Sequence, residues 1–579
     1  MTTLSPSTPP VKPHPVGRPR EVTQTKEAQV IQALVKGLLL HGELPPDLEL
    51  ARESDLSERT IRGIRLAHGV NRWEMRRWLN QKDPQTQSSA ALTCTTPWAG
   101  LWLLAPVILD SALPRAVTLL NLPGQAAHTA WPLVLTLLLL PLMGFTRLLH
   151  LHDFRHAAEL GLALLTGRTR LWADSTVWDY LHRLSADAVQ AFYQTTAAAT
   201  IDPIDSHSAA CVSFDEHVVP IFTKRRPLPL GKTRVPTRGR AYPAVRLYAH
   251  FDLLKERFLG LVVTPARKRL SQMLPTLIAE VRSLKQRAGQ HDWRRLRAIF
   301  DRGGYKGSLF AELVADPDLT FVTLAGGYAT NVRQWEAIPK EQFHPYTPPH
   351  EKGKVLKLAD TVTAVGDCPV PLRSVVIRDD TLGTKQKWRV ILTNDRTTPA
   401  EELDAEYRPR QKHEMGYRSF KHALKGDYLP KAYRMVRIPN EQNERRHTVA
   451  TVHDETTLQA VQLVGWLRFL AFNLVRDLGQ RLGSTVARME VATLVRKFLL
   501  RPGQLQVIGK EFHVTLEPFE GHATLTAYLE KINQERRSLP WLGNLVLQMH
   551  IAPTAPQHNA NCRNWQERVF ANSPDPSTA

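Results

Sequence analysis

The order of apolar runs between residues 209 and 315 limits most strongly what this chain can fold into. Three runs rich in β-branched or aromatic residues come first, in "AACVSFDEHVVPIF", "YPAVRLYAHFD" and "RFLGLVVTP". The helical segment "RKRLSQMLPTLIAEVRSLKQRAG" follows, and then "LRAIFDRGGYKGSLFAELVAD", an apolar strand that leads through a Gly-rich turn into a helix. Three strands, a helix, a strand and a helix predict an open α/β sheet with helices packed on it.

Residues 25 to 80 predict a compact helical unit. Within it, "LELARESDLSERTIRGIRLAHGV" has apolar residues at helix-turn-helix spacing, and Ser57 is placed to cap the second helix. Arg59, Arg62 and Arg65 would project from the helix that could enter a DNA major groove. An ordinary helical hairpin with a basic solvent face is the alternative.

At 579 residues the chain is too long for one ordinary core. We expect α/β core elements of the ribonuclease-H-like kind, a β-rich insertion and N-terminal helical domains. The predicted boundaries are a disordered basic tail (1–22), a helix-turn-helix-like DNA-binding domain (23–90), a helical domain (91–204), the first part of the core (205–318), the insertion (319–398), the second part of the core (399–500) and a C-terminal region (501–579).

One uncharged stretch raises the question of a membrane. "TAWPLVLTLLLLPLMGFT", residues 129 to 146, has the minimum length for a bilayer span, but Pro132 and Pro141 interrupt it. We predict a buried helix of a helical domain, because short apolar runs are more often core.

The charge of the chain favours a polyanionic partner. Lys and Arg total 75 against 55 Asp and Glu, which gives a formal charge of +20, so nucleic acid is the first candidate and an anionic membrane surface the second. The segment "TKRRPLPLGKTRVPTRGR" contains Arg225 and Arg226 and no acid, and we predict that it contacts DNA. A solvated loop is the alternative. The four cysteines form no C-x2-C pair, which predicts a reduced, intracellular chain without zinc fingers.

Two aspartates stand where an unpaired charge is costly. Asp215 lies inside the apolar run "CVSFDEHVV". Asp301 directly follows the apolar run "RAIF" and comes just before Gly303 and Gly304. Ligands of open α/β sheets gather at the carboxyl edge of the strands, so we expect both aspartates to converge there. A strand edge facing water, or an ordinary turn aspartate, would explain either one alone.

A third carboxylate stands alone in a basic segment. "YRPRQKHEMGYRSFK", residues 407 to 421, carries only Glu414 among its Arg, Lys and His residues. On a helix, Glu414 and Lys421 share a face and Arg418 lies one turn from Glu414. Surface pairing at i,i+4 is the alternative, and it would stabilise the helix by only ~0.2–0.5 kcal/mol per pair. The pattern indicates a carboxylate that holds a cation beside a polyanion.

Asp215, Asp301 and Glu414 together form an oxygen-rich ligand set. Such a set suits Mg²⁺ or Mn²⁺, which prefer hard anionic ligands. Two such ions can activate an attacking oxygen and stabilise a leaving oxygen in phosphodiester displacement. We therefore predict a two-metal site with basic residues around it that bind the flanking phosphates.

The spacing of Tyr407, Arg410, Glu414 and Lys421 reproduces the Y-R-E-K signature. On these residues the chain resembles DDE transposases of the bacterial insertion-sequence-four type over about residues 205–480. The two aspartates fall where that family keeps its first and second acids, and the β-rich insertion lies between the second acid and the glutamate. The chain departs from the family at Gln411, where many relatives have Trp, and at Glu216 and His217, which replace a common triplet after the first acid.

The resemblance implies a ribonuclease-H-like core whose catalytic and metal-binding residues are Asp215, Asp301 and Glu414. The enzyme would cut the element's ends, and the freed 3′-hydroxyl would attack target DNA. Tyr407, Arg410, Arg418 and Lys421 would contact phosphates, and a homodimer would act on paired ends in the nucleoid-associated cytoplasm. Some relatives hold a flipped base on an aromatic residue of the insertion. Trp335 and Trp388 are the candidates here, with a buried core tryptophan as the alternative.

Three other interpretations stay open from the sequence. A domesticated, transposase-derived DNA-binding protein would keep the fold without transposing, although a pure binder has no use for three carboxylates that repel DNA. A metal-dependent DNA nuclease would use the same site. A membrane-associated protein would be anchored by residues 129 to 146.

Overall fold

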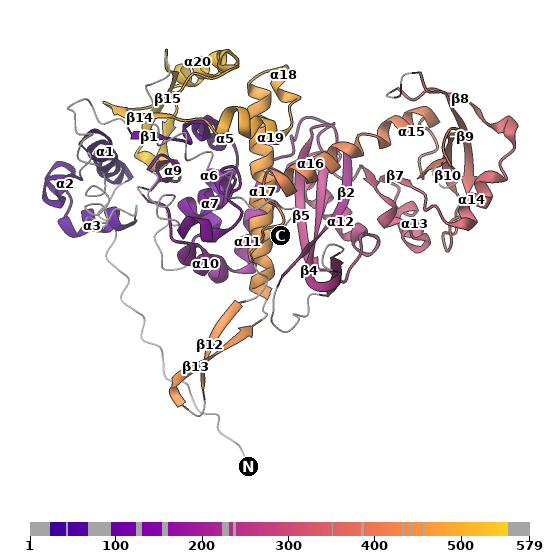
Figure 1. The fold of residues 1–579 in the computed structure, drawn as a ribbon, viewed down its shortest axis with the longest axis horizontal. Helices are drawn as coiled ribbons and strands as arrows, with labels where there is room; N and C mark the ends of the chain where they lie inside the picture. The colour runs from indigo at the N-terminus through magenta and orange to yellow at the C-terminus, as the bar shows by residue number, and fades with distance from the viewer. Residues whose placement is uncertain are drawn as a thin grey trace.

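The computed structural model describes residues 24–41, 44–67, 94–122, 130–152, 160–168, 170–222, 231–235, 239–349, 351, 353–383, 387–430, 434–440, 443–452 and 455–553. The fold is mixed α/β (Figure 1). A helical N-terminal part and a small sheet formed mainly by C-terminal residues lie on one side of a long central helix, and a large sheet lies on the other.

The large sheet contains ten strands, and the core of it follows the order that the apolar runs predict. Its strands are β2 (Cys211–Pro220), β3 (Lys232–Val235), β4 (Arg240–Asp252), β5 (Arg257–Pro265), β6 (Leu296–Phe300), β7 (Leu319–Leu324), β8 (His344–Tyr346), β9 (Leu356–Thr363), β10 (Leu372–Arg378) and β11 (Trp388–Thr393). They lie in the order β3-β4-β2-β6-β7-β11-β10-β9-β8, with β5 also paired to β4. Helix α12 (Leu270–Arg287) connects β5 to β6, and α13 (Gly307–Val314) connects β6 to β7. Only β2, β6 and β7 pair in parallel within this sheet.

The predicted β-rich insertion continues this sheet. Strand β7 pairs in parallel with β6 from Leu296↔Leu319 to Phe300↔Thr323, and β11, β10, β9 and β8 then add antiparallel to it. The predicted boundary between residues 318 and 319 therefore falls between strands β6 and β7, which are hydrogen-bonded neighbours in one sheet. The strand from residue 319 belongs with the core, and the added strands follow after helix α14 (Ala329–Glu336).

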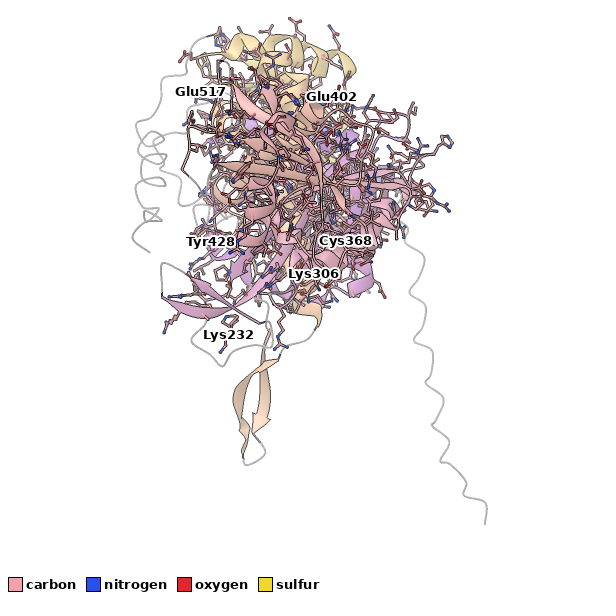
Figure 2. The ribbon with its side chains drawn as sticks, turned by 90° about the vertical axis from the view of Figure 1, so that its right-hand side faces the viewer. Lys232, Lys306, Cys368, Glu402, Tyr428 and Glu517 are labelled. Atoms are coloured by element: carbon pink, nitrogen blue, oxygen red, sulfur yellow. The ribbon has the colours of Figure 1, made fainter. Side chains whose placement is uncertain are left out.

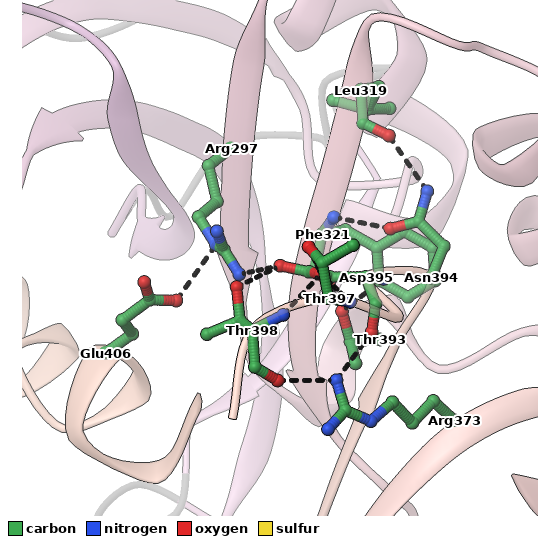
Figure 3. A network of polar contacts seen from close by, with 10 residues as sticks. All are labelled: Arg297, Leu319, Phe321, Arg373, Thr393, Asn394, Asp395, Thr397, Thr398 and Glu406. Carbon is green, nitrogen blue, oxygen red and sulfur yellow. Dashed lines mark hydrogen bonds and ion pairs between the residues drawn. The ribbon is translucent and has the colours of Figure 1, made fainter. Parts of the chain in front are cut away.

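A polar network ties the end of the added strands back to the core (Figure 3). Arg297 of β6 donates to Asp395 at 2.5 Å and lies 3.0 Å from Glu406 of helix α15 (Ala400–Tyr407). Asp395 also accepts hydrogen bonds from the backbone N–H and hydroxyl groups of Thr397 and Thr398. Because the chain continues from α15 into α16 (Arg410–His422), this network fixes where α16 begins.

The long helix α17 (Glu455–Arg481) joins the helical part to the large sheet (Figure 1). On the sheet side, Phe469 stacks on Phe258 of β5 with ring centroids 3.9 Å apart. On the other side, the indole N–H of Trp466 donates to Thr196 at 2.7 Å. The helices and turns packed on this side are η2 (Ala99–Leu104), α5 (Ala105–Asp110), α6 (Leu113–Ala116), η3 (Val117–Leu120), α7 (Ala130–Leu139), η5 (Leu148–His152), α9 (Leu160–Leu165), α10 (Asp174–Arg183) and α11 (Ala186–Ala198).

The apolar stretch is a buried helix, as predicted. In α7, Ala130 and residues 132–139 are all buried. By length and composition, only residues Leu458–Arg481 form a single helix able to cross a membrane within the described residues, and 83% of the apolar window is buried inside the protein. A second candidate exists only if Ala99–Asp110 and Leu113–Leu120 are taken together across a 74° bend.

The N-terminal helical unit has three described helices, α1 (Gln24–His41), α2 (Asp47–Ser54) and α3 (Glu58–Ala67). Ser57 precedes α3, and its hydroxyl accepts from the N–H of Thr60 at 3.2 Å, as the sequence predicts. Arg59 and Arg62 are exposed on α3. Arg65 is buried and paired with Asp47 at 2.9 Å, so the expectation that it projects outward is wrong.

The C-terminal region forms a second sheet. It consists of β1 (Cys94–Thr96), β14 (Gly503–Ile508), β15 (Glu511–Leu516), β16 (Ser538–Leu539) and β17 (Leu545–Ile551), with helix α20 (Thr526–Glu535) beside them. Helices α18 (Ser484–Ala487), α19 (Val491–Leu494) and the single π-turn Val495–Leu499 connect α17 to it. Strand β1 comes from the segment predicted as helical. It pairs with β14, so this sheet combines residues 94–96 with strands from residues 503–551.

The network at Asp395 generates a stability prediction. Replacing the buried Asp395 by Asn removes one of the two carboxylates that pair with the part-buried Arg297 and weakens the hydrogen bonds from Thr397 and Thr398, and we expect a loss of about 1–3 kcal/mol in the free energy of unfolding at pH 7. Burial alone would raise the pKa of Asp395, but the hydrogen bonds from Thr398 and Thr397 outweigh it and hold that pKa below 3.8. The contribution is therefore present at neutral pH and is lost as the pH falls below about 4.

Denaturant unfolding of both proteins at several pH values checks this. The matched control is Asp360→Asn, which removes an ion-paired aspartate whose side chain is 40% exposed and should cost less than about 1 kcal/mol. An equal loss in the two variants, or a loss for Asp395→Asn that grows as the pH falls, would contradict the assignment.

Candidate active site

The parallel pairing of β2 with β6 brings Asp215 and Asp301 together. The register runs from Cys211↔Arg297 to Phe214↔Phe300, so the next residue on each strand is an aspartate. Strand alternation places Asp301 on the same face as Arg297, which contacts Glu406 of α15. Asp215 contacts Arg410 of α16, the helix that follows α15. Both aspartates therefore belong to the α15–α16 face of the sheet, with Asp301 directly after the carboxyl end of β6 and Asp215 in the middle of β2, where the pairing with β6 ends.

Glycines allow the chain to turn directly after Asp301. The Asp301 carboxylate accepts from the N–H of Gly303 at 2.8 Å and caps the short 3₁₀ turn Arg302–Gly304. A Cβ on Gly304 would lie 2.5 Å from the ring of Phe300, so a larger residue would displace the strand end. Lys306 follows this turn and is exposed at the surface near Cys368 (Figure 2).

Helix α16 is seated on β2 by residues that the sequence did not single out. His413 is fully buried, and its Nδ1 lies 2.9 Å from the hydroxyl of Ser213. Its ring stacks on Phe251, and burial holds the pKa of His413 well below the ordinary value. The hydroxyl of Tyr417 donates to the backbone carbonyl of Asp215 at 3.2 Å. In the sequence, His413 reads as one more base, but it is a neutral anchor of the helix.

Arg410 connects the first and third predicted acids. One guanidinium nitrogen lies 3.6 Å from Asp215, and another is hydrogen-bonded to Glu414. Burial raises the pKa of Asp215 to about 6, with Arg410 opposing the rise and Asp301 and Glu414 adding to it. Burial likewise raises the pKa of Tyr407 to about 12, against the influence of Arg410. The five predicted residues thus share one electrostatic environment.

The site is suited to a cation but is not arranged as a complete metal site. Within the described part of the chain, no three His, Cys, Asp or Glu side chains are gathered so that they could hold a metal ion. The guanidinium of Arg410 bridges Asp215 and Glu414 instead. The Tyr407 hydroxyl and one Arg410 nitrogen are buried without a hydrogen-bond partner. The carboxylates of Asp301 and Glu414 add to the rise in the pKa of Asp215, and the three would fit a hard divalent cation if Arg410 released Glu414.

Lys421 and Arg418 extend the basic face of α16. Arg418 is exposed. Lys421 is 47% exposed and lies 3.7 Å from Asp427, whose other oxygen is 2.7 Å from Nε2 of His217. His217 is two residues beyond Asp215 and therefore points to the same face of β2. The contact between His217 and Asp427 was not predicted. The one signal in the sequence is that His217 stands two residues after Asp215 and so lies on the same face of the strand.

The other predicted DNA-contacting residues lie elsewhere. Arg59 and Arg62 are on α3, in the separate N-terminal helical unit. Arg225 and Arg226 lie outside the described residues.

The two tryptophans considered for base stacking are packed in the interior. Trp335 is 3% exposed and Trp388 is 8% exposed, so the core alternative holds for both. Tyr328, in contrast, is 60% exposed in the segment after β7, with its ring 5.7 Å from that of Tyr305. Tyr305 is half-buried and lies four residues after Asp301, so this pair borders the edge of the sheet that carries the aspartate.

Comparisons with known proteins give little for this chain. No family model and no curated protein matches it. A solved structure, described as a cryo-EM structure of a piggyBac transposase synaptic complex with hairpin DNA, is similar with a TM-score of 0.36 and 9% identity over 70% of this chain and 76% of that chain. At that TM-score the likeness carries no weight for function, which therefore rests on the residues.

The raised pKa of Asp215 predicts how a variant changes stability with pH. Above pH 6 the folded chain holds a buried carboxylate that the unfolded chain would ionise near 3.8. The stability of the wild type therefore falls as pH rises from about 4 through about 6. In metal-free protein, Asp215→Asn should be more stable than wild type above pH 6 by up to about 3 kcal/mol.

Chemical denaturation of metal-free protein between about pH 4 and 8 checks this. The stability difference between variant and wild type should vanish near pH 4. A difference that is independent of pH would show that Asp215 is not held as described.

Proposed function

We propose that the chain is a DDE transposase of the insertion-sequence-four type with a ribonuclease-H-like catalytic core. It would cleave DNA at the ends of an insertion sequence and join those ends to target DNA. The single observation that carries this proposal is the register of β2 and β6, which sets Asp215 and Asp301 side by side beneath the helix that bears Glu414. The Y-R-E-K spacing over residues 407 to 421 supports it.

Asp215, Asp301 and Glu414 would hold the catalytic metal. When bound, two Mg²⁺ or Mn²⁺ ions would activate the attacking oxygen and stabilise the leaving oxygen of the phosphodiester. In the chain itself, Arg410 neutralises Asp215 and Glu414, which keeps like charges together at modest cost.

The cations around the acids would bind the phosphates on either side of the cut. Arg410 can exchange Glu414 for a phosphate, since a guanidinium forms bidentate bonds with either group. Lys421 is exposed beside Asp427, and the buried hydroxyl of Tyr407 lies beside Arg410. Arg418 would contact the DNA backbone further along α16. Phosphate contacts fix position but carry no sequence information.

Recognition of the element's ends would come from other parts of the chain. The exposed Arg59 and Arg62 of α3 would enter the DNA major groove, and Arg225 and Arg226 would add sequence-independent affinity. A homodimer acting on paired ends within the nucleoid-associated cytoplasm is part of the same proposal. The formal charge of +20 favours DNA as a partner.

Cleavage of a duplex that carries the sequence flanking the gene tests the proposal. The wild type is compared with Glu414→Gln in Mg²⁺, because this near-isosteric change removes only the charge. We expect the variant to bind the duplex as well as the wild type and to lose at least about 100-fold in cleavage rate. The matched control is Glu402→Gln on α15, an exposed glutamate of the preceding helix (Figure 2), which should cleave normally.

Undiminished cleavage by Glu414→Gln would refute the site. If none of the proteins cleaves the duplex and all of them, wild type included, bind it, a domesticated DNA-binding protein would be favoured. Cleavage without strand transfer would favour a nuclease.

A further inference from the structure

A two-stranded ribbon, formed by the chain between α16 and α17, projects from the protein (Figure 1). Strands β12 (Arg434–Asn440) and β13 (Asn443–Val452) pair antiparallel, from Arg434↔Val452 to Pro439↔His447. Neither strand belongs to another sheet of the described chain. Figures 1 and 2 show the ribbon extending away from the body of the protein in both views.

A ribbon of this kind is not expected to be stable alone. An isolated two-stranded hairpin is marginal at best in water, and stable hairpins pack against a third strand or a helix. Within the described chain, β12 and β13 pair only with each other. The ribbon thus lacks a third strand, which indicates that another molecule covers it.

The charge of the ribbon identifies the class of that molecule. Its described residues include four arginines, Arg434, Arg437, Arg445 and Arg446, and one acid, Glu444, which leaves a formal charge of +3. A two-stranded ribbon has the width that the major groove of B-DNA admits. A polyanionic duplex therefore fits the ribbon better than a second copy of this chain, which is itself strongly basic.

The turn that precedes the ribbon, residues 425–428, is fixed beside the proposed site. Arg468 of α17, 2% exposed, donates to the backbone carbonyls of Lys425 and Tyr428. Asp427, within the same turn, is bonded to His217 of β2. A Cβ on Gly426 would clash with the ring of Phe420, so this turn packs closely on α16. The chain that leads into the ribbon is thus held near the carboxylates.

We propose that the β12–β13 ribbon binds the DNA duplex that extends outward from the cleavage site. This inference rests on the proposed function and deepens it, because it assigns a part of the chain to the flanking DNA. At about 3.3 Å per residue, the ten residues of β13 extend about 30 Å, which is close to 10 base pairs of B-DNA. The ribbon therefore contacts roughly one helical turn beyond the cut.

Binding measured without divalent metal tests the ribbon apart from cleavage. The full chain is titrated with a duplex that has about 20 base pairs on each side of the cut and with one that has about 5. In the test variant the four ribbon arginines become glutamine. In the control variant four exposed basic residues of the C-terminal part become glutamine, namely Arg488, Lys510, Lys531 and Arg536.

We expect the wild type to bind the long duplex at least about tenfold more tightly than the short one. The ribbon variant should lose this difference, and the steepness of its salt dependence on the long duplex should fall by up to about four. The control variant should keep the difference. Arg445→Gln with Arg446→Gln should show a partial loss, which guards against misfolding of the fourfold variant.

An unchanged length dependence in the ribbon variant would overturn the inference. A shift from dimer to monomer in sedimentation, with length dependence retained, would also overturn it and would make the ribbon a protein contact. Failure of the wild type to bind either duplex would refute the proposed function as well, whereas wild-type cleavage with an inert ribbon would refute the ribbon alone.

Discussion

The parallel pairing of β2 with β6 sets the geometry on which the proposed site depends. The register shared by β2 and β6 ends one residue before an aspartate on each strand, so neither Asp215 nor Asp301 can move without its strand. A slip of the register by one residue would turn one aspartate to the opposite face of the sheet. The apolar residues that bury both strands are therefore what holds two like charges near one another, at the cost that the raised pKa of Asp215 records.

Helix α16 supplies the third carboxylate because it is fixed at its start and in its middle. At its start, the network of Arg297, Asp395 and Glu406 fixes the preceding helix. In its middle, His413 and Tyr417 bind β2 at Ser213 and at the carbonyl of Asp215. These contacts are buried and neutral, whereas the residues one turn away are charged and face outward. The helix thus has an anchoring side and a charged side.

The sequence predicts the elements better than it predicts their partners. The strand and helix order of residues 209 to 315 and the cap at Ser57 are confirmed, because both depend on local patterns. The membership of β7 in the core is not predictable, since an apolar strand does not reveal which neighbour it pairs with in parallel. Arg65 reads as an exposed base because its partner, Asp47, lies far outside one helical turn. Strand β1 is only three residues long and shows no pattern of its own.

Asp215 and Asp301 could be singled out because a charge in or directly after an apolar strand is unusual, and Glu414 because it is the one acid in a basic segment; their role as a metal site stays a prediction. The roles of His413, Tyr417 and Asp427 were not, because each depends on a contact across many residues of sequence. Asp427 lies beside Lys421 of α16 and His217 of β2, and only the folded turn brings it there. The ribbon of β12 and β13 was also not predicted, since its short mixed segments resemble a loop.

The most direct test of the account is whether Asp215, Asp301 and Glu414 hold one metal site. Binding of Mn²⁺ can be followed by electron paramagnetic resonance in the wild type and in Asp215→Asn, Asp301→Asn and Glu414→Gln. The account predicts bound Mn²⁺ in the wild type and affinity weaker by at least about tenfold in each variant. Equal Mn²⁺ binding by the wild type and all three variants would contradict it.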